Sequence, residues 1–244
     1  MEYYFITGSS YGIGKHLTEQ LLRRDNVKVH GFSRHQTITH PHYSHHTIDL
    51  SKLDELKTFS FPEPVSTPEK IILVNNAGII GDINFIGHKS TDKIIDTFTV
   101  NTIAPSILIN QFLKQFSTMN DTEKLILNIS SGAGRHSIAV WADYCASKAA
   151  LDMYSEVFEE EQVYRVDNGE PHTRIFSIAP GIIDTNMQKE IRATDKNRFP
   201  YHETFVNYHH NKLLTPPEET ARKLTDIIDN PAKYEEVILD LRHL

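Results

Sequence analysis

Short apolar runs alternate with longer amphipathic stretches from one end of this chain to the other. The apolar runs have the length of buried strands, and the stretches between them carry apolar residues at helical spacing. Such alternation requires right-handed crossovers, which produce a parallel sheet with helices on both faces. We expect strands at 3–7, 27–32, 71–74, 125–129, 175–179 and 237–239, and helices near 13–24, 92–116, 143–164 and 217–229. A further short strand is expected to end at Asp49, ahead of Ser51 as a candidate helix cap. The pattern predicts an α/β fold of the Rossmann type, a doubly wound parallel sheet.

No linker or internal repeat divides the 244 residues, so we expect a single domain over 1–244. The segment 182–214 is long and aromatic, and it separates the strand at 175–179 from the next helix. A segment of this kind predicts a lid over a binding site.

The composition excludes several classes of partner. The net charge of −7, without a basic stripe, argues against nucleic acid, which binds basic surfaces. No apolar stretch approaches the length of a membrane span, and the N-terminal sequence lacks the pattern of a signal peptide. The only cysteine, Cys145, rules out an intrachain disulfide and is typical of a reducing compartment. We predict a cytoplasmic protein.

Six of the 14 histidines fall between His30 and His46. Their density raises the question of a metal site, but no cysteine lies nearby and the segment reads as a loop before a strand. We interpret them as solvated loop histidines and predict no metal.

A glycine-rich loop follows the first expected strand and precedes the first helix. There the backbone can approach a pyrophosphate, whose charge the helix N-terminus favours. The spacing is G-x-x-x-G-x-G, and an ordinary tight turn is the alternative explanation. The predicted phosphate-binding residues are Gly8, Ser10, Tyr11, Gly12, Ile13 and Gly14.

The end of the second strand distinguishes the two nicotinamide cofactors. NAD enzymes place a carboxylate there for the ribose 2′-hydroxyl, whereas NADP needs a cation for its 2′-phosphate. This chain has Ser33 and Arg34 and no acid, so the sequence predicts NADP(H), although Arg34 can also be read as a solvated loop residue. Further cofactor residues are expected where the next two strands end, at Asp49, Leu50, Asn76, Ala77 and Gly78.

The stretch YCASK places Tyr144 four residues before Lys148 in an expected helix. Residues at this spacing share one helix face, so the lysine lies beside the phenol. A nearby cation favours the phenolate and lowers the tyrosine pKa from its usual value of about 10. The spacing suits an acid–base tyrosine, whereas a chance pair of surface residues is the alternative.

Taken in order, these motifs resemble the short-chain dehydrogenase/reductase family over essentially the whole chain. The resemblance also includes Asn101 within TVNTIAP, NISSG at 128–132 and PGIIDT at 180–185. It implies a catalytic set of Asn101, Ser131, Tyr144 and Lys148, with Ser131 preferred to Ser130 because it lies thirteen residues before the tyrosine. It also implies nicotinamide contacts from Pro180, Gly181, Ile183 and Thr185.

A narrower resemblance, to the sepiapterin reductases and bacterial benzil reductases, lies in YCASKAALDM, PGIIDTNMQ and the ending EEVILDL. It implies substrate contacts from Trp141, Met187 and Asp240, the last matching an aspartate that sepiapterin reductases place against the pterin. For Trp141 and Met187, ordinary packing in the core or lid is the alternative explanation. For Asp240, the alternative is a solvated carboxylate at the end of a strand.

The expected function is NADPH-dependent reduction of a small-molecule ketone or vicinal dicarbonyl. Tyr144 would donate the proton, Ser131 would bind the carbonyl oxygen, and Asn101 would anchor a water linking Lys148 to solvent. Cys145 has no evident base partner and is read as packing. The family resemblance implies a homodimer or homotetramer. A non-catalytic dinucleotide sensor and an NAD-dependent alcohol dehydrogenase remain alternatives.

Overall fold

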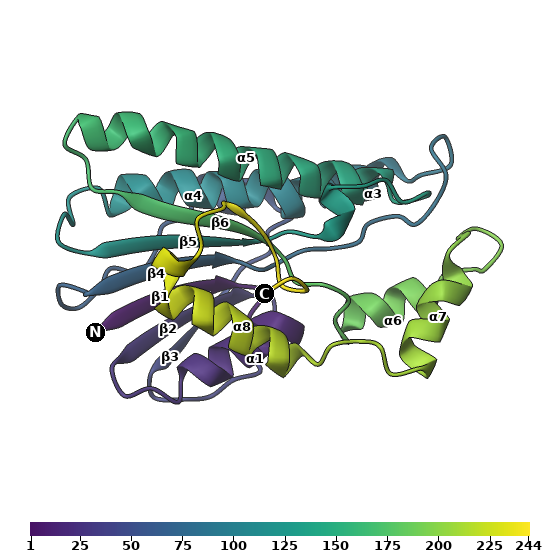
Figure 1. The fold of residues 1–244 in the computed structure, drawn as a ribbon, viewed down its shortest axis with the longest axis horizontal. Helices are drawn as coiled ribbons and strands as arrows, with labels where there is room; N and C mark the ends of the chain where they lie inside the picture. Colours follow the sequence, from purple (N-terminus) through teal and green to yellow (C-terminus); the bar gives the residue numbers. More distant parts are fainter.

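Seven parallel strands form one sheet in the computed structural model, which describes residues 1–244, and helices cover both faces of the sheet (Figure 1). The strand order is β3-β2-β1-β4-β5-β6-β7, so the order reverses between β1 and β4. This arrangement confirms the predicted doubly wound α/β fold. The strands are β1 (Glu2–Thr7), β2 (Val27–Ser33), β3 (Tyr43–Thr47), β4 (Lys70–Asn75), β5 (Glu123–Ile129), β6 (Thr173–Ala179) and β7 (Ile238–Asp240).

The helices follow the strands as the alternation predicts. They are α1 (Gly12–Leu21), α2 (Leu53–Lys57), α3 (Thr91–Phe98), α4 (Ala104–Gln115), α5 (Ala142–Asp167), α6 (Asn186–Arg192), α7 (His202–His210) and α8 (Pro217–Asp229). The expected helix near 92–116 is interrupted by a π-helical turn at Thr99–Ile103, which joins α3 to α4. None of the helices is long and apolar enough to cross a membrane.

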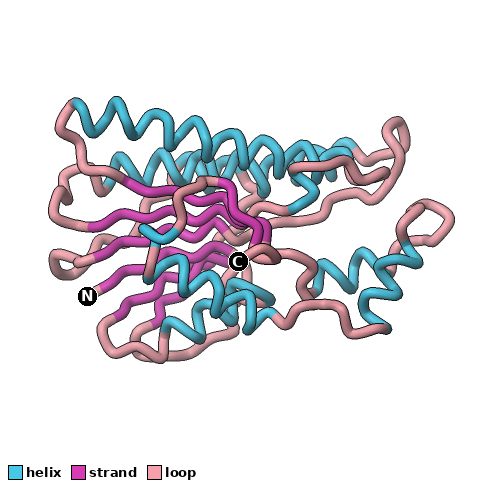
Figure 2. Tube along the Cα trace, in the orientation of Figure 1, coloured by secondary structure: helices cyan, strands magenta, loops and turns pink.

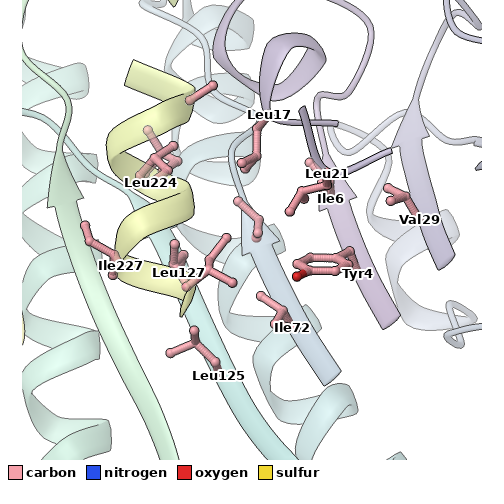
Figure 3. Close-up of a cluster of buried hydrophobic side chains, with 14 of the residues drawn as sticks. Tyr4, Ile6, Leu17, Leu21, Val29, Ile72, Leu125, Leu127, Leu224 and Ile227 are labelled. Carbon is pink, nitrogen blue, oxygen red and sulfur yellow. The ribbon is translucent and has the colours of Figure 1, made fainter. Parts of the chain in front are cut away.

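Two hydrophobic cores lie on opposite faces of the sheet, because successive side chains of a strand point to opposite sides. On one face, Tyr4 and Ile6 of β1 pack in one cluster with Leu17 of α1 and Leu224 of α8 (Figure 3). On the other face, Tyr3 and Phe5 share a cluster with residues of α4 and α5. Strands buried on both faces explain the near-continuous apolar runs in the sequence.

Three local expectations are wrong. The third strand ends at Thr47 rather than Asp49, and Ser51 does not cap a helix, since α2 begins at Leu53 after Lys52. The histidines of this region are not all solvated loop residues. His30 is buried on β2, where its ring stacks on Phe5.

All seven strands point the same way, so their carboxyl ends meet at one edge of the sheet. Beyond this edge lie α6 and α7, which fall within the segment 182–214 and were not expected as helices (Figure 2). Ligands of open α/β sheets bind outside the carboxyl ends of the strands, at the point where the strand order reverses. The fold therefore predicts a binding site at this edge of the sheet.

Candidate active site

A cavity of about 1150 Å³ follows the carboxyl edge of the sheet. The loops after β1, β2, β4, β5 and β6 line it, together with α6 and α7. Among the residues singled out in the sequence, those lining this cavity are Gly8, Ser10, Tyr11, Gly12, Ile13, Ser33, Arg34, Asp49, Leu50, Asn76, Ala77, Gly78, Ser131, Trp141, Tyr144, Lys148, Pro180, Gly181, Ile183, Thr185 and Met187. Gly14, Asn101 and Asp240 do not line it.

The glycine loop depends on two separate properties of glycine. Gly8 and Gly12 have φ angles of 66° and 55°, a left-handed region that side chains disfavour. Gly14 is required for space, because a Cβ there would stand 2.3 Å from Nδ2 of Asn76. That same Nδ2 donates to the backbone oxygens of Thr7 and Gly8, so the loops after β1 and β4 are tied together.

Polar and basic side chains gather where β2 ends. Ser10 Oγ donates a 2.6 Å hydrogen bond to Ser33 Oγ, which connects the glycine loop to this strand end. Arg34 is exposed, lines the cavity and forms no ion pair within the chain. The pKa of Asp49 is lowered although its desolvation opposes this, because hydrogen bonds from Ser51 and the charge of Arg34 favour the carboxylate. His35 lines the same end and was missed, since a histidine there carries no motif.

Ser131, Tyr144 and Lys148 meet beyond the end of β5. Ser131 Oγ accepts a 3.1 Å hydrogen bond from the backbone N–H of Ala133, and its side chain lies near enough to Tyr144 to lower the pKa of the phenol. Lys148 Nζ donates a 2.7 Å hydrogen bond to the backbone oxygen of Ile129. Ser130 also lines the cavity, but its Oγ points to the backbone oxygen of Lys148. The geometry favours Ser131 over Ser130, as the sequence spacing does.

Burial dominates the ionisation of the tyrosine–lysine pair. It raises the pKa of Tyr144 above its usual value, while the nearby side chain of Ser131 acts in the opposite direction. It also lowers the pKa of Lys148 to about 8, against the opposing charge of Asp152. Lys148 was expected to supply only part of the lowering of the Tyr144 pKa, with the oxidised cofactor adding to it. In the protein alone, desolvation outweighs the lowering effect of Ser131.

Asn101 lies in the π-helical turn and is fully buried. Its Nδ2 donates hydrogen bonds to the backbone oxygen of Ile79 at 2.9 Å and to Ser147 Oγ at 3.0 Å. Its Oδ1 accepts a 2.9 Å hydrogen bond from the backbone N–H of Ile79. A Cβ on Gly78 would stand 3.4 Å from both Asn101 Oδ1 and Lys148 Nζ. Asn101 thus holds the loop after β4 against the helix that carries the tyrosine and the lysine.

The other end of the cavity is aromatic. Trp141 is 6% exposed, and its ring centroid lies 5.7 Å from that of Phe199 in a stacked arrangement and 5.3 Å from that of Phe205. Tyr144 meets the indole edge-on at 5.7 Å. These contacts join the start of α5 to the segment that contains α6 and α7. Met187 packs against the same cluster.

Asp240 lies outside the large cavity, contrary to the expectation of a substrate contact. Its carboxylate forms an ion pair with Arg242, which lines the cavity in its place. The hydrogen bonds from Arg242 lower the pKa of Asp240 to about 2. Arg242 was not identified as a site residue from the sequence, because the resemblance pointed to the aspartate. The signal in the sequence was a basic residue two positions after Asp240.

Comparisons with known proteins identify the family of the chain. The sequence profile of the family described as short chain dehydrogenase matches residues 2–196. Benzil reductase ((S)-benzoin forming) of Bacillus subtilis (strain 168) is 33% identical over 235 residues, with 94% of each chain covered. Sepiapterin reductase of Xenopus tropicalis is 29% identical over 171 residues, which cover 69% of this chain and 62% of that protein. The crystal structure of the KRED1-Pglu enzyme has a TM-score of 0.74 at 24% identity, with 93% and 94% coverage.

The profile spans most of the chain, and most of the residues that carry the resemblance line one cavity at the carboxyl edge of the sheet. Enzymes of this family act on small molecules with nicotinamide cofactors. The chain belongs to the short-chain dehydrogenases, and it is an oxidoreductase of that family.

Proposed function

We propose that this protein is an NADPH-dependent carbonyl reductase that acts on an aromatic ketone or vicinal dicarbonyl. The observation that carries the proposal is the meeting of Ser131, Tyr144 and Lys148 beside an aromatic pocket, in one cavity with the glycine loop. The similarity to a benzil reductase over nearly the whole chain supports the substrate class.

The residues fit a phosphorylated dinucleotide. Gly8 and Gly12, both with left-handed backbone, line the cavity beside the N-terminus of α1, where a pyrophosphate is favoured. The exposed guanidinium of Arg34, without an ion pair of its own, suits a 2′-phosphate and favours NADP over NAD. The adenosine end of the proposed site is completed by Ser33, Asp49, Leu50, Asn76, Ala77 and Gly78. The nicotinamide end is formed by Pro180, Gly181, Ile183 and Thr185.

The proposed chemistry is a hydride and a proton added across a carbonyl bond. NADPH, when bound, supplies the hydride to the carbonyl carbon, and the π electrons of the bond move to oxygen. Tyr144 donates its phenolic proton to that oxygen, and Ser131 donates a hydrogen bond that stabilises the developing charge. The products are an alcohol and NADP⁺.

Lys148 serves this step by its charge and its place one helical turn from Tyr144. Its ammonium favours the phenolate that remains once the proton has left, and it can return a proton from solvent. Asn101 acts as a positioning residue, because both hydrogens of its amide are engaged by Ile79 and Ser147. Only the second lone pair of its Oδ1 remains for the expected water relay.

The segment 182–214 is proposed as a lid over the substrate end. Its Met187, Phe199 and Phe205 pack on Trp141, whose Nε1 is buried without a hydrogen-bond partner in the protein. A flat aromatic substrate can pack against these rings where they line the cavity. We further propose a homo-oligomer, from the family, and a cytoplasmic location, from the single cysteine.

The test follows the oxidation of NADPH and NADH by absorbance, with benzil, sepiapterin and a simple aliphatic ketone as substrates. We expect NADPH to be consumed with a dicarbonyl, and Tyr144→Phe to lower kcat by about 10²–10⁴-fold. Tyr164→Phe is the matched control, because Tyr164 is an exposed tyrosine on the same helix.

Two results would oppose the proposal. Faster turnover of alcohols with NAD⁺ than of ketones with NADPH would favour an NAD-dependent alcohol dehydrogenase. Tight binding of NADPH without turnover of this panel and of a chemically diverse second panel would favour a dinucleotide sensor.

A further inference from the structure

The C-terminal strand end holds an arginine against an aspartate. Nε of Arg242 donates to Oδ1 and Oδ2 of Asp240 at 2.9 and 3.2 Å, and Nη2 donates to Oδ2 at 2.5 Å. The aspartate side chain is 11% exposed and the arginine side chain 53%. Arg242 lines both the large cavity and a smaller neighbouring pocket, whereas Asp240 lines only the smaller pocket. Of the two residues, only Arg242 reaches the large cavity.

The guanidinium is placed beside the proposed catalytic residues by two glycines. Its Nη2 lies 3.6 Å from the position that a Cβ on Gly132 would take, and Gly132 directly follows Ser131. Its Cγ lies 3.3 Å from the Cβ position of Gly181, so the aliphatic stem packs on the loop after β6. Tyr208 of α7 lies near enough to contribute to the raised pKa of Arg242, after the larger effect of Asp240. Arg242 thus faces the substrate end.

The remaining hydrogen-bonding capacity of this group selects the kind of ligand. A guanidinium carries five N–H donors and no acceptor. Asp240 engages Nε and one side of Nη2, and Nη1 makes no hydrogen bond within the protein. Because the carboxylate offsets the positive charge, the pair offers donors with little net charge, which suits a neutral oxygen acceptor.

The same pairing disfavours a ligand whose outer edge carries donors. The amino group and ring N–H of a pterin need an acceptor, and the carboxylate expected to serve them is engaged by Arg242. In a vicinal diketone, by contrast, the oxygen of the second carbonyl is an acceptor that can receive a hydrogen bond from the unpaired N–H groups of Arg242. The structure therefore separates the two substrate types between which the resemblance leaves a choice.

We propose that Arg242 binds the second carbonyl oxygen of a vicinal diketone while the first is reduced, and that Asp240 is the positioning residue that orients the guanidinium. The inference rests on the proposed function and narrows it to diketones in preference to pterins.

The test compares benzil with deoxybenzoin, which has a methylene group in place of one carbonyl. Benzil is intrinsically more reactive, so the informative quantity is the change in the ratio of the two kcat/KM values on substitution. We expect Arg242→Met to lower this ratio about tenfold, the loss of one hydrogen bond to a charged group. Arg242→Lys should restore part of it, and Asp240→Asn should lower it by less than Arg242→Met.

Arg222→Met is the matched control, because Arg222 is an exposed arginine of α8 outside the cavity. An unchanged ratio in Arg242→Met, or an equal fall for both ketones, would overturn the inference and leave the proposed function standing. Failure of the wild type to reduce either ketone would instead oppose the proposed function.

A binding measurement makes the inference independent of turnover. Trp141 is the only tryptophan and lies at the substrate end, so its fluorescence reports on ligands there. Titration of the protein without reducing cofactor should show about tenfold weaker benzil binding in Arg242→Met and unchanged deoxybenzoin binding. Equal benzil affinity in wild type and Arg242→Met would overturn the inference, and thermal unfolding of each variant identifies any that fails to fold.

Discussion

Lys148 Nζ and the backbone oxygen of Ile129 are joined by a 2.7 Å hydrogen bond, and this ammonium is buried. A single carbonyl partner replaces the water that a lysine normally has, which is why burial lowers the pKa of Lys148 to about 8. The chain keeps this group one helical turn from Tyr144 at a cost in stability. A group retained in spite of such a cost is typical of a functional site.

The cost leads to a prediction for Lys148→Met. A pKa lowered from 10.5 to about 8 corresponds to roughly 3 kcal/mol of destabilisation below pH 8, where both folded and unfolded states are protonated. Loss of the hydrogen bond to Ile129 offsets about 1 kcal/mol. We expect the variant to be inactive and about 2 kcal/mol more stable than the wild type at pH 7, measured by urea denaturation.

The advantage of Lys148→Met should shrink as the pH rises from 8 to 10.5. In that window the unfolded wild type still binds the proton that the folded protein has released, so wild-type stability increases with pH. Lys114→Met, at an exposed position of α4, is the control and should change stability little. A Lys148→Met variant less stable than the wild type at pH 7 would contradict the prediction.

Arg34 should decide between the two nicotinamide cofactors. Removal of its charge in Arg34→Gln deletes charge-assisted hydrogen bonds to a 2′-phosphate, which are worth about 1.5–3 kcal/mol. We expect the KM for NADPH to rise at least about tenfold, with little change for NADH, in steady-state assays with one ketone. Arg23→Gln, an exposed arginine outside the cavity, is the control. Parallel changes for both cofactors would show that Arg34 does not contact the phosphate.

His30 should make the protein sensitive to acid. Burial, with smaller effects of His46 and Lys28, lowers the pKa of His30 to about 4. Between pH 6.5 and 4 the unfolded chain binds a proton here that the folded chain does not, so stability falls as the pH falls. His30→Phe keeps a ring against Phe5 and removes this titration.

The expected result for His30→Phe is a loss of stability from pH 7 to pH 4.5 that is about 2 kcal/mol smaller than in the wild type. Urea denaturation at the two pH values measures it. His209→Phe, on the exposed end of α7, serves as the control. The same loss in His30→Phe and wild type would mean that other groups account for the acid sensitivity.

The sequence by itself determined the sheet and most of the cavity. Apolar runs predict strands because burial on both faces leaves few positions for polar residues, and strand–helix alternation permits a parallel order. The glycine loop and YCASK could be recognised because their function depends on short spacings, such as the one helical turn between Tyr144 and Lys148. The bounds of β3 were misplaced because its residues, YSHHT, are mostly polar.

Only the tertiary structure decided the environment of the charged groups. The raised pKa of Tyr144 follows from burial under distant segments, and no local spacing encodes it. The burial of His30 depends on Phe5, a residue of the neighbouring strand. Arg242 lies beside Gly132 and Gly181 because three strands end at the same edge of the sheet. Desolvation and contacts between residues far apart in the chain depend on the packed fold, so the sequence alone did not reveal them.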